Sequence, residues 1–383
     1  MLVLFLAASA APTPLYRVYQ ARWEFSATTL TAVFAVYVLF LLMTVLTFGS
    51  LSDHVGRRPV IITAIAVDTA ACVLFLLAPG VGALFAARAL QGVAVGLAAT
   101  AIGAALLDLR PAGNLAPLVT SNAGIVGLAL GALGTSVLVQ YGPVQTKLVW
   151  WLLLAAFLAA IVLVAATPEP GTARPGALAS LQPDVRVPRS ARSTFARAAP
   201  CLVAVWALGG FYLSLGPSLA AQLSGSRNLL WGGVITFLLT GLGAVTSSAF
   251  RDSAPPAVML GGCLGLLGGA VVTVAAIVTR TPALLVAGTV LAGLGFGPGN
   301  LGAYRVIMAR AAASDRAGLI AAVSVVNYLA FGLPALIAGV ATSHFGLHDT
   351  ALAYSVVIAL LAAAAAVGFL FEGSARARAP RAS

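Results

Sequence analysis

The feature that most constrains this chain is a succession of apolar runs, each about 20 residues long, separated by short polar segments. Hydrophobic residues make up 61% of its 383 residues, and charged residues make up only 8%. An ordinary soluble domain carries about 25% charged residues, because its surface faces water. These proportions exclude a soluble globular protein and predict an all-α integral membrane protein whose exterior faces lipid.

A helix needs about 20 apolar residues to cross the hydrocarbon core of a bilayer. The runs of that length are 29–48, 59–78, 82–107, 115–139, 148–166, 198–223, 229–250, 254–279, 281–304, 317–343 and 350–371. A further apolar stretch runs from Met1 to about Tyr16. Together these segments predict a chain of about twelve membrane-spanning helices, a number that divides into six plus six.

The first apolar stretch is unusual because Pro12 and Pro14 interrupt it soon after it begins. It is too short for a full crossing unless the helix continues through a kink. We expect a truncated first helix whose true start lies upstream. A cleavable signal peptide that ends near Ala10 is the alternative, but the stretch lacks the positively charged leading segment of such peptides.

The longest polar connection, 167–197, lies near the middle of the chain and contains five prolines with scattered arginines. Proline removes backbone donors and charges resist burial, so this segment is expected to be a flexible linker on the surface. It separates an N-terminal six-helix bundle, 1–166, from a C-terminal six-helix bundle, 198–372, and a basic tail follows at 373–383. A weak internal repeat, 84–142 against 284–346, supports the division into halves.

The distribution of Arg and Lys between loops predicts the orientation of the chain. If the loop with Arg57 and Arg58 faces the cytoplasm, 15 of the 21 basic residues fall on that side and 5 on the other, with Arg88 inside a span. Both termini are then cytoplasmic. The net charge of +11 is therefore interpreted as an orientation signal that faces anionic lipid, and nucleic-acid binding is not expected. The strong preference for Arg over Lys indicates a bacterial protein of the inner (plasma) membrane.

The polar run between the spans at 29–48 and 59–78 carries the most specific pattern in the sequence. It reads G-x-L-S-D-x-x-G-R-R, from Gly49 through Asp53 and Gly56 to Arg57 and Arg58. The glycines permit a tight turn between antiparallel helices, and the carboxylate of Asp53 can accept from free N–H groups at a helix start. This pattern resembles the loop between helices two and three of the major facilitator superfamily, and it lies at the same place in the order of spans.

The resemblance implies a transporter in which two six-helix bundles rock about a central site. It implies that the loop latches the outward-facing state on the cytoplasmic side. Asp53 would then meet the start of helix eleven near Gly318, and Arg57 or Arg58 would pair with Asp108 at the end of helix four. A second similarity is Arg88-Ala-Leu-Gln91-Gly92, which is similar to the R-x-x-Q-G pattern of the family's fourth helix.

The fifth span carries glycines at positions 124, 127, 131 and 134. Such spacing lets helices approach closely. It partly resembles the glycine-rich motif of the family's antiporters, although the Gly-Pro pair of that motif is absent.

Two ionisable residues, Asp68 and Arg88, lie within consecutive spans. A charge inside a membrane costs about 2.5–3.5 kcal/mol on insertion scales, so it normally faces the protein interior. Counted from the loop that the two helices share, the residues differ in depth by about 6 Å, within reach of an arginine side chain. We expect an interaction between them. It is either a structural ion pair or a site at which Asp68 takes up protons and Arg88 gates them or binds an anionic substrate.

The resemblance implies a substrate cavity lined by helices one, four, seven and ten. Helix seven contains a Gly216-Pro217 kink, and the run 295–300 is expected to break helix ten and expose its backbone. The candidate cavity residues are Asn122, Trp206, Phe211, Tyr212, Asn300 and Asn327. Because the cavity is poor in charge apart from Arg88, a neutral, lipophilic or weakly anionic substrate is favoured over a cationic one.

The sequence as a whole predicts a secondary transporter, namely a monomeric proton-coupled exporter of small hydrophobic or drug-like molecules. A proton-coupled uptake symporter for a sugar or organic acid is the alternative within transport. A non-transporting sensor or scaffold, or a membrane-embedded enzyme, would belong to other classes. The three histidines are scattered and the three cysteines lie inside spans, so neither catalysis nor a disulfide or metal site is expected. No phosphate-binding loop for ATP occurs, and no cofactor is expected beyond the proton gradient.

Overall fold

Every regular element in the described part of the chain is a helix. The computed structural model describes residues 1–109, 115–169, 171, 175–312 and 315–378. The first half contains α1 (Leu2–Ala10), α2 (Pro12–Trp23), α3 (Ala27–Phe48), α4 (Leu51–Val55), α5 (Arg57–Leu77), α6 (Val81–Asp108), α7 (Leu115–Tyr141) and α8 (Leu148–Ala166). The second half contains η1 (Ala179–Leu181), α9 (Arg192–Ser214), α10 (Gly216–Ser224), α11 (Leu230–Ala249), α12 (Pro255–Thr279), α13 (Pro282–Met308) and α14 (Arg316–Arg378).

The number of membrane-spanning helices agrees with the sequence. Among the described residues, 11 helical stretches are long and apolar enough to cross a membrane. The last of them, within α14, contains two helices joined at Gly346, whose φ of 81° is not helical. The predicted architecture of twelve helices in an all-α membrane protein is confirmed.

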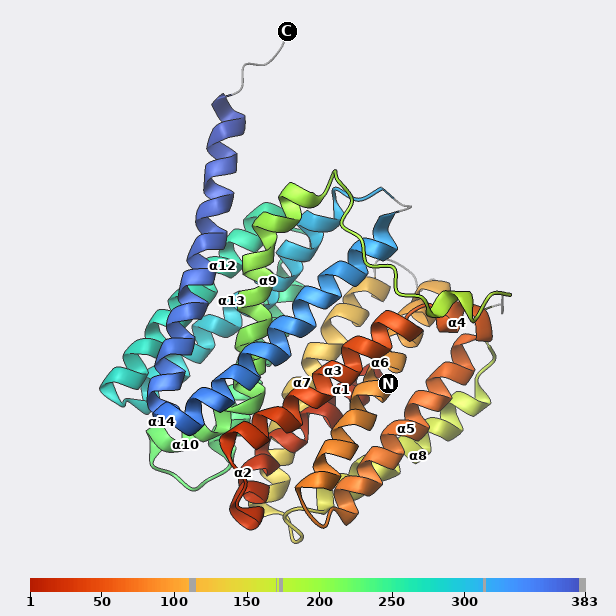
Figure 1. The fold of residues 1–383 in the computed structure, drawn as a ribbon, viewed down its shortest axis with the longest axis vertical. Coiled ribbons are helices and arrows are strands. Elements are labelled where there is room, and N and C mark those ends of the chain that lie inside the picture. Colours follow the sequence, from red (N-terminus) through yellow and green to blue (C-terminus); the bar gives the residue numbers. More distant parts are fainter. Residues whose placement is uncertain (110–114, 170, 172–174, 313–314, 379–383) are drawn as a thin grey trace.

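The first helix is longer than the sequence indicated, because it continues through a kink. Ala11 keeps helical backbone angles between α1 and α2, so the two segments form one bent span, Leu2–Trp23. Val3 and Leu6 lie against Gly127, which is near the middle of α7. The beginning of α1 is therefore level with the interior of the bundle, as Figure 1 shows.

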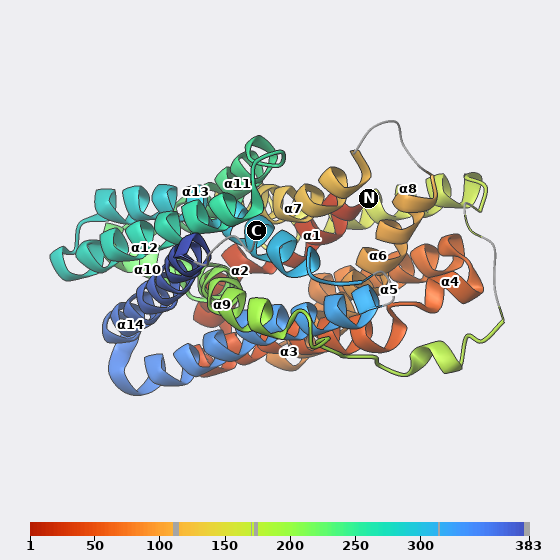
Figure 2. The same ribbon diagram turned by 90° about the horizontal axis from the view of Figure 1, so that it is seen from above.

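The helices form two bundles that lie side by side. Figures 1 and 2 show the first bundle, from α1 to α8, beside the second, from α9 to α14. Two large hydrophobic cores fill them, one built mainly from the first half of the chain and one from the second. The bundles touch each other through α3 against α14 and α7 against α11.

The two ends of the bundles differ in how they are joined. We call the end with residues 49–58 the motif face and the end with residues 24–26 and 225–229 the opposite face. At the opposite face, Thr28 Oγ1 lies 2.9 Å from Ser343 Oγ, and the Leu229 N–H donates to Gln140 Oε1 at 3.0 Å. These hydrogen bonds link the first bundle to the second, so the bundles are closed against each other there.

Two local expectations are wrong. The polar linker does not extend to residue 197, because α9 already begins at Arg192. Helix ten is not broken at 295–300, because α13 runs without interruption from Pro282 to Met308 with Pro298 inside it. Its glycines serve close packing: a Cβ on Gly295 would lie 2.5 Å from the Leu266 nitrogen of α12. Backbone atoms of α12 therefore lie directly against α13 at Gly295.

Candidate functional site

The loop at the motif face is more ordered than a plain turn. Residues Leu51–Val55 form the short helix α4, and α5 begins at Arg57. Gly56 joins them with a φ of 99°, a conformation that side chains with a Cβ rarely adopt. The sharp reversal at Gly56 places Asp53 and Arg57 beside each other.

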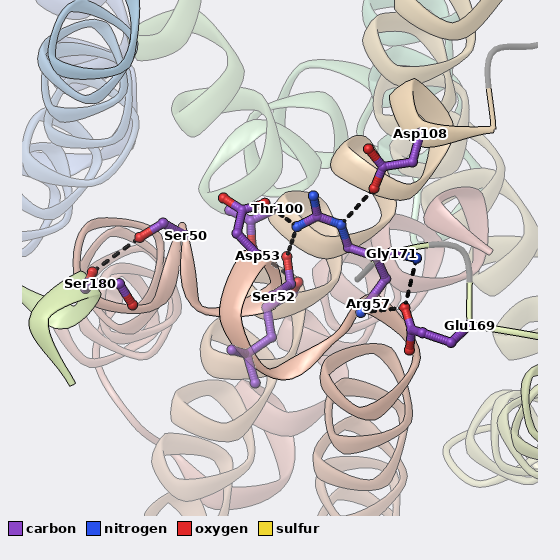
Figure 3. Close-up of polar contacts among 10 residues, drawn as sticks. Ser50, Ser52, Asp53, Arg57, Thr100, Asp108, Glu169, Gly171 and Ser180 are labelled. Atoms are coloured by element: carbon purple, nitrogen blue, oxygen red, sulfur yellow. Dashed lines mark hydrogen bonds and ion pairs between the residues drawn. The ribbon is translucent and has the colours of Figure 1, made fainter. Parts of the chain in front are cut away.

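Arg57 is the centre of a polar network, which Figure 3 displays. Its Nε donates to Asp108 Oδ2 at 2.9 Å, and its NH1 donates to Ser52 Oγ at 2.8 Å. The same NH1 forms an ion pair with Asp53. The pair with Asp108 at the end of α6 was expected from the sequence, with Arg57 or Arg58 as the partner, and the structure assigns it to Arg57.

Glu169 joins this network, and the sequence interpretation missed it. Its carboxylate accepts from the backbone N–H of Arg57 at 2.8 Å and from that of Arg58 at 2.9 Å. It thus caps the start of α5, where free N–H groups and the helix dipole favour a negative charge. Arg58 in turn donates to the Ala165 carbonyl near the end of α8. The signal in the sequence was a lone acidic residue directly after the sixth span.

Asp53 does not reach the second bundle. The expected contact with the start of helix eleven near Gly318 is absent from the described structure. The Gly318 carbonyl instead accepts from the backbone N–H of Arg186, in the linker, at 3.2 Å. The network of Arg57, Asp53, Asp108 and Glu169 therefore stays within the first bundle and the segment that leaves it.

Arg88 and Gln91 are anchored to the kink of the first helix. Proline has no N–H, so Pro12 leaves the Ala8 carbonyl without its usual partner four residues on. Gln91 Nε2 donates to that carbonyl at 3.0 Å. Arg88 NH1 donates to the Ser9 carbonyl at 2.8 Å and to Gln91 Oε1 at 2.9 Å. The two motif residues on α6 therefore compensate for the interruption in helix one.

Aromatic rings surround the guanidinium of Arg88 and connect it to the second bundle. Its Cζ lies 4.0 Å from the ring centroid of Tyr37 and 5.8 Å from that of Phe34. The Phe34 ring meets Phe331 of α14 edge-on at 5.0 Å, and Phe331 meets Trp206 of α9 at 5.6 Å. A continuous aromatic path thus crosses the interface between the bundles.

Asp68 does not form the expected ion pair. Its side chain is completely buried on α5, and neither carboxylate oxygen has a hydrogen-bond partner among the described residues. NH1 of Arg88 is engaged by Ser9 and Gln91 instead. The depths of the two residues in their spans did not indicate that NH1 of Arg88 would donate to the Ser9 carbonyl on helix one and to Gln91 on α6.

Two of the four glycines of the fifth span, Gly127 and Gly131, lie closely against helix one. A Cβ on Gly127 would stand 2.6 Å from the Val3 carbonyl oxygen, and one on Gly131 would collide with Ala7. These glycines therefore let α1 and α7 pack backbone to backbone within the first bundle, as close small-residue contacts do in membranes.

Of the six candidate cavity residues, four lie where polar groups meet between helices. The indole N–H of Trp206 donates to Asn300 Oδ1 at 3.1 Å. Asn122 Nδ2 donates across the bundle interface to Ser248 Oγ of α11 at 2.9 Å. Asn122 Oδ1 and Asn327 Oδ1 are buried and have no partner among the described residues. These two oxygens are therefore unsatisfied acceptors in this conformation.

The other two candidates, Phe211 and Tyr212, lie inside the second bundle. The Tyr212 hydroxyl lies 2.8 Å from Thr289 Oγ1 of α13, and the Phe211 ring stacks on Tyr354 at 4.7 Å. Both side chains belong to the second hydrophobic core. Their contacts are satisfied there, so their position does not favour contact with a substrate.

Comparisons with known proteins agree with this geometry. The fold is similar to that of a bacterial homologue of the human lysosomal transporter Spinster, in an inward-facing and unoccupied conformation, with a TM-score of 0.76, 14% identity and coverage of 100% of this chain and 97% of that one. It is also similar to the nucleoside transporter NupG, with a TM-score of 0.69, 12% identity and 96% coverage of both chains.

A third similar structure is the human organic anion transporter MFSD10 (TETRAN), with a TM-score of 0.66, 16% identity and coverage of 95% and 96%. At these identities the likeness concerns the fold alone. No curated protein matches the sequence significantly. The model of the Major Facilitator Superfamily matches residues 1–252. That match spans well over half of the chain, so the protein belongs to the Major Facilitator Superfamily.

Proposed function

We propose that this transporter exports small hydrophobic or drug-like molecules in exchange for protons. Membership of the family makes the chain a multi-pass membrane protein and a secondary transporter that works by alternating access. The direction of transport, the coupling ion and the substrate class are the proposed part. The observation that carries the proposal is the unpaired carboxyl group of Asp68 inside the first bundle.

A carboxylate without a hydrogen bond is unstable in the interior of a membrane protein. Burying an isolated ionised group is so unfavourable that the group takes up a proton instead. Asp68 is fully buried and unpaired, so it holds a proton in this conformation. A rearrangement that frees Arg88 from Ser9 and Gln91 would bring a positive charge to Asp68 and favour release of the proton. This exchange links proton movement to a change of conformation.

The chemistry of the bundle interface favours neutral, hydrophobic substrates. Trp206, Phe331 and Phe34 supply aromatic surface. The free amide oxygens of Asn122 and Asn327 accept hydrogen bonds, so they suit hydroxyl or amide N–H groups. A small apolar molecule with a few such donors matches these groups, in keeping with the mainly apolar character of ligand sites.

The positions of the basic residues favour a cytoplasmic motif face. A bacterial inner membrane and a monomeric state remain part of the proposal. Because the bundles are hydrogen-bonded to each other at the opposite face, while Asp53 makes no contact with the start of α14, we assign this conformation to the inward-facing state.

The test is a resistance profile in a host that lacks its own pumps, with wild type compared with Asp68→Asn, Arg88→Ala and Asp53→Asn. We expect wild type to raise resistance to neutral hydrophobic antibiotics and the three variants to lose it. Asp252→Asn is the matched control, because it removes a carboxylate that is exposed near the motif face, and it should behave as wild type. Export by Asp68→Asn at the wild-type rate with undiminished proton movement would exclude Asp68 as the coupling site.

Flux in membrane vesicles separates the alternatives. If protons and a sugar or organic acid moved in the same direction, the chain would be an uptake symporter. If a reconstituted protein moved neither protons nor any member of the antibiotic panel, a sensor or scaffold role would replace transport.

A further inference from the structure

The segment between the bundles is attached to both of them. On the side of the first bundle, Ser50 Oγ donates to the Ser180 carbonyl at 3.1 Å, as Figure 3 shows. On the side of the second bundle, the Arg186 N–H donates to the Gly318 carbonyl at 3.2 Å. This segment is therefore a fixed part of the motif face in this conformation. We call residues 184–190 the strap.

The strap fits closely against the first turn of α14. A Cβ added to Gly318 would stand 3.2 Å from the Arg186 Cβ and 3.4 Å from the Arg186 nitrogen, which is tighter than ordinary contact. A second bond ties the end of the strap, where Ser190 Oγ donates to the Arg310 carbonyl at 3.2 Å. The absence of a side chain at Gly318 is what allows the backbones to meet.

The strap is bonded to Gly318, near which the resemblance to the family places the contact of Asp53 with α14. The start of a helix offers free N–H groups and a partial positive charge, which attract a carboxylate. Asp53 is turned toward Arg57 in its own bundle, and the strap lies against Gly318 in the first turn of α14. Two backbone segments cannot occupy the same surface, so Asp53 can contact α14 at Gly318 only after the strap has moved.

We propose that the strap is a conformational lock for the transport cycle. While it is bound to Gly318, it prevents closure of the motif face and holds the conformation in which the opposite face is closed. Release of the Arg186–Gly318 hydrogen bond is then a required step before the latch can engage. The central linker thereby sets the balance between the two states, besides joining the bundles.

The test measures the distance between the bundles at the motif face without any substrate. Spin labels are placed on Val55→Cys at the end of α4 and Phe250→Cys after α11, both exposed, in full-length protein in lipid nanodiscs. The native cysteines are buried. Arg186→Pro removes the donating N–H. Arg186→Ala removes the side chain and keeps the N–H, and Val185→Pro places the same ring at a position whose N–H makes no hydrogen bond in the described structure.

Arg186→Pro should raise the population with short distances about threefold to tenfold relative to wild type, the effect of one hydrogen bond on an equilibrium. Arg186→Ala and Val185→Pro should match wild type. Ser190→Ala is a conservative change that removes the hydrogen bond to the Arg310 carbonyl. It should also raise the population with short distances, by about twofold to threefold.

Two results would overturn the proposal. One is an unchanged distance distribution in both Arg186→Pro and Ser190→Ala. The other is an equal shift in Arg186→Ala and Arg186→Pro, because the side chain rather than the backbone contact would then control the equilibrium.

Discussion

Replacement of Gln91 tests whether the motif on α6 is tied to the kink of helix one. Gln91 is completely buried, and both ends of its amide are used, by the Ala8 carbonyl at 3.0 Å and by Arg88 at 2.9 Å. Gln91→Leu keeps a similar volume and removes both bonds. The Ala8 carbonyl is then left without a partner, because Pro12 cannot supply an N–H.

The expected loss of stability follows from these two bonds. An orphaned buried carbonyl costs about 1–3 kcal/mol in soluble proteins, whereas side-chain hydrogen bonds inside a membrane protein average about 0.6 kcal/mol. Taking both groups together, Gln91→Leu should destabilise the protein by about 2 kcal/mol. Pro12→Ala restores an N–H to helix one, so in that background the Ala8 carbonyl regains a partner. The cost of Gln91→Leu should then fall by about 1 kcal/mol.

The assay is a double-mutant cycle measured by denaturation with sodium dodecyl sulfate in mixed micelles. Pro14→Ala serves as the control. Pro14 leaves the carbonyl of Ala10 without an N–H partner, and Gln91 does not contact that carbonyl. The destabilisation caused by Pro14→Ala and by Gln91→Leu should therefore be additive. If Pro12→Ala and Gln91→Leu were also additive to within about 0.3 kcal/mol, the link between the kink and the α6 motif would be refuted.

Three further predictions concern the network and the interface. Glu169→Gln removes the charge at the start of α5 and should destabilise the protein by about 1 kcal/mol in the same denaturation assay; equal stability would contradict the capping role. Arg57→Lys offers a single ammonium in place of the guanidinium that holds Asp108, so transport should slow about tenfold in proteoliposomes, and an unchanged rate would count against the network. Trp206→Phe deprives Asn300 of its donor and should weaken the apparent affinity for an exported antibiotic about threefold to tenfold, whereas an unaltered affinity would remove this pair from the substrate site.

The spans were predictable because their cause is local. Each needs only a sufficient run of apolar residues, and α8, for example, lies at 148–166 as expected. The bend of the first helix was harder to interpret. Prolines at positions 12 and 14 are compatible with the end of a helix or with a kink in a continuous helix. The packing of α6 against helix one decides between these two structures.

The missed features depend on contacts between distant segments. Glu169 caps a helix that begins more than a hundred residues earlier in the chain, and no local pattern indicates that partner. In α13, the glycines at 295–299 are equally suited to a broken helix and to close packing. The structure uses Gly295 and Gly299 for packing against α12 and α9. The order of polar residues along the chain does not indicate which helices these glycines pack against.

The arrangement around Arg88 explains why an arginine and an aspartate at similar depths remain unpaired. A buried ion pair stabilises each charge by the other, so it holds both in one protonation state and resists change. Here NH1 of Arg88 donates to the backbone carbonyl of Ser9 and to the amide oxygen of Gln91, and under the proposed function Asp68 is left to exchange its proton. Because the Ser9 carbonyl lies on the kinked helix, and Gln91 on α6 is itself bonded to the Ala8 carbonyl of that helix, we expect a change in the bend to alter how firmly Arg88 is held. Under the proposed function, the kink, the arginine and the carboxyl group therefore act together, and we expect movement of helix one to change the affinity of Asp68 for a proton.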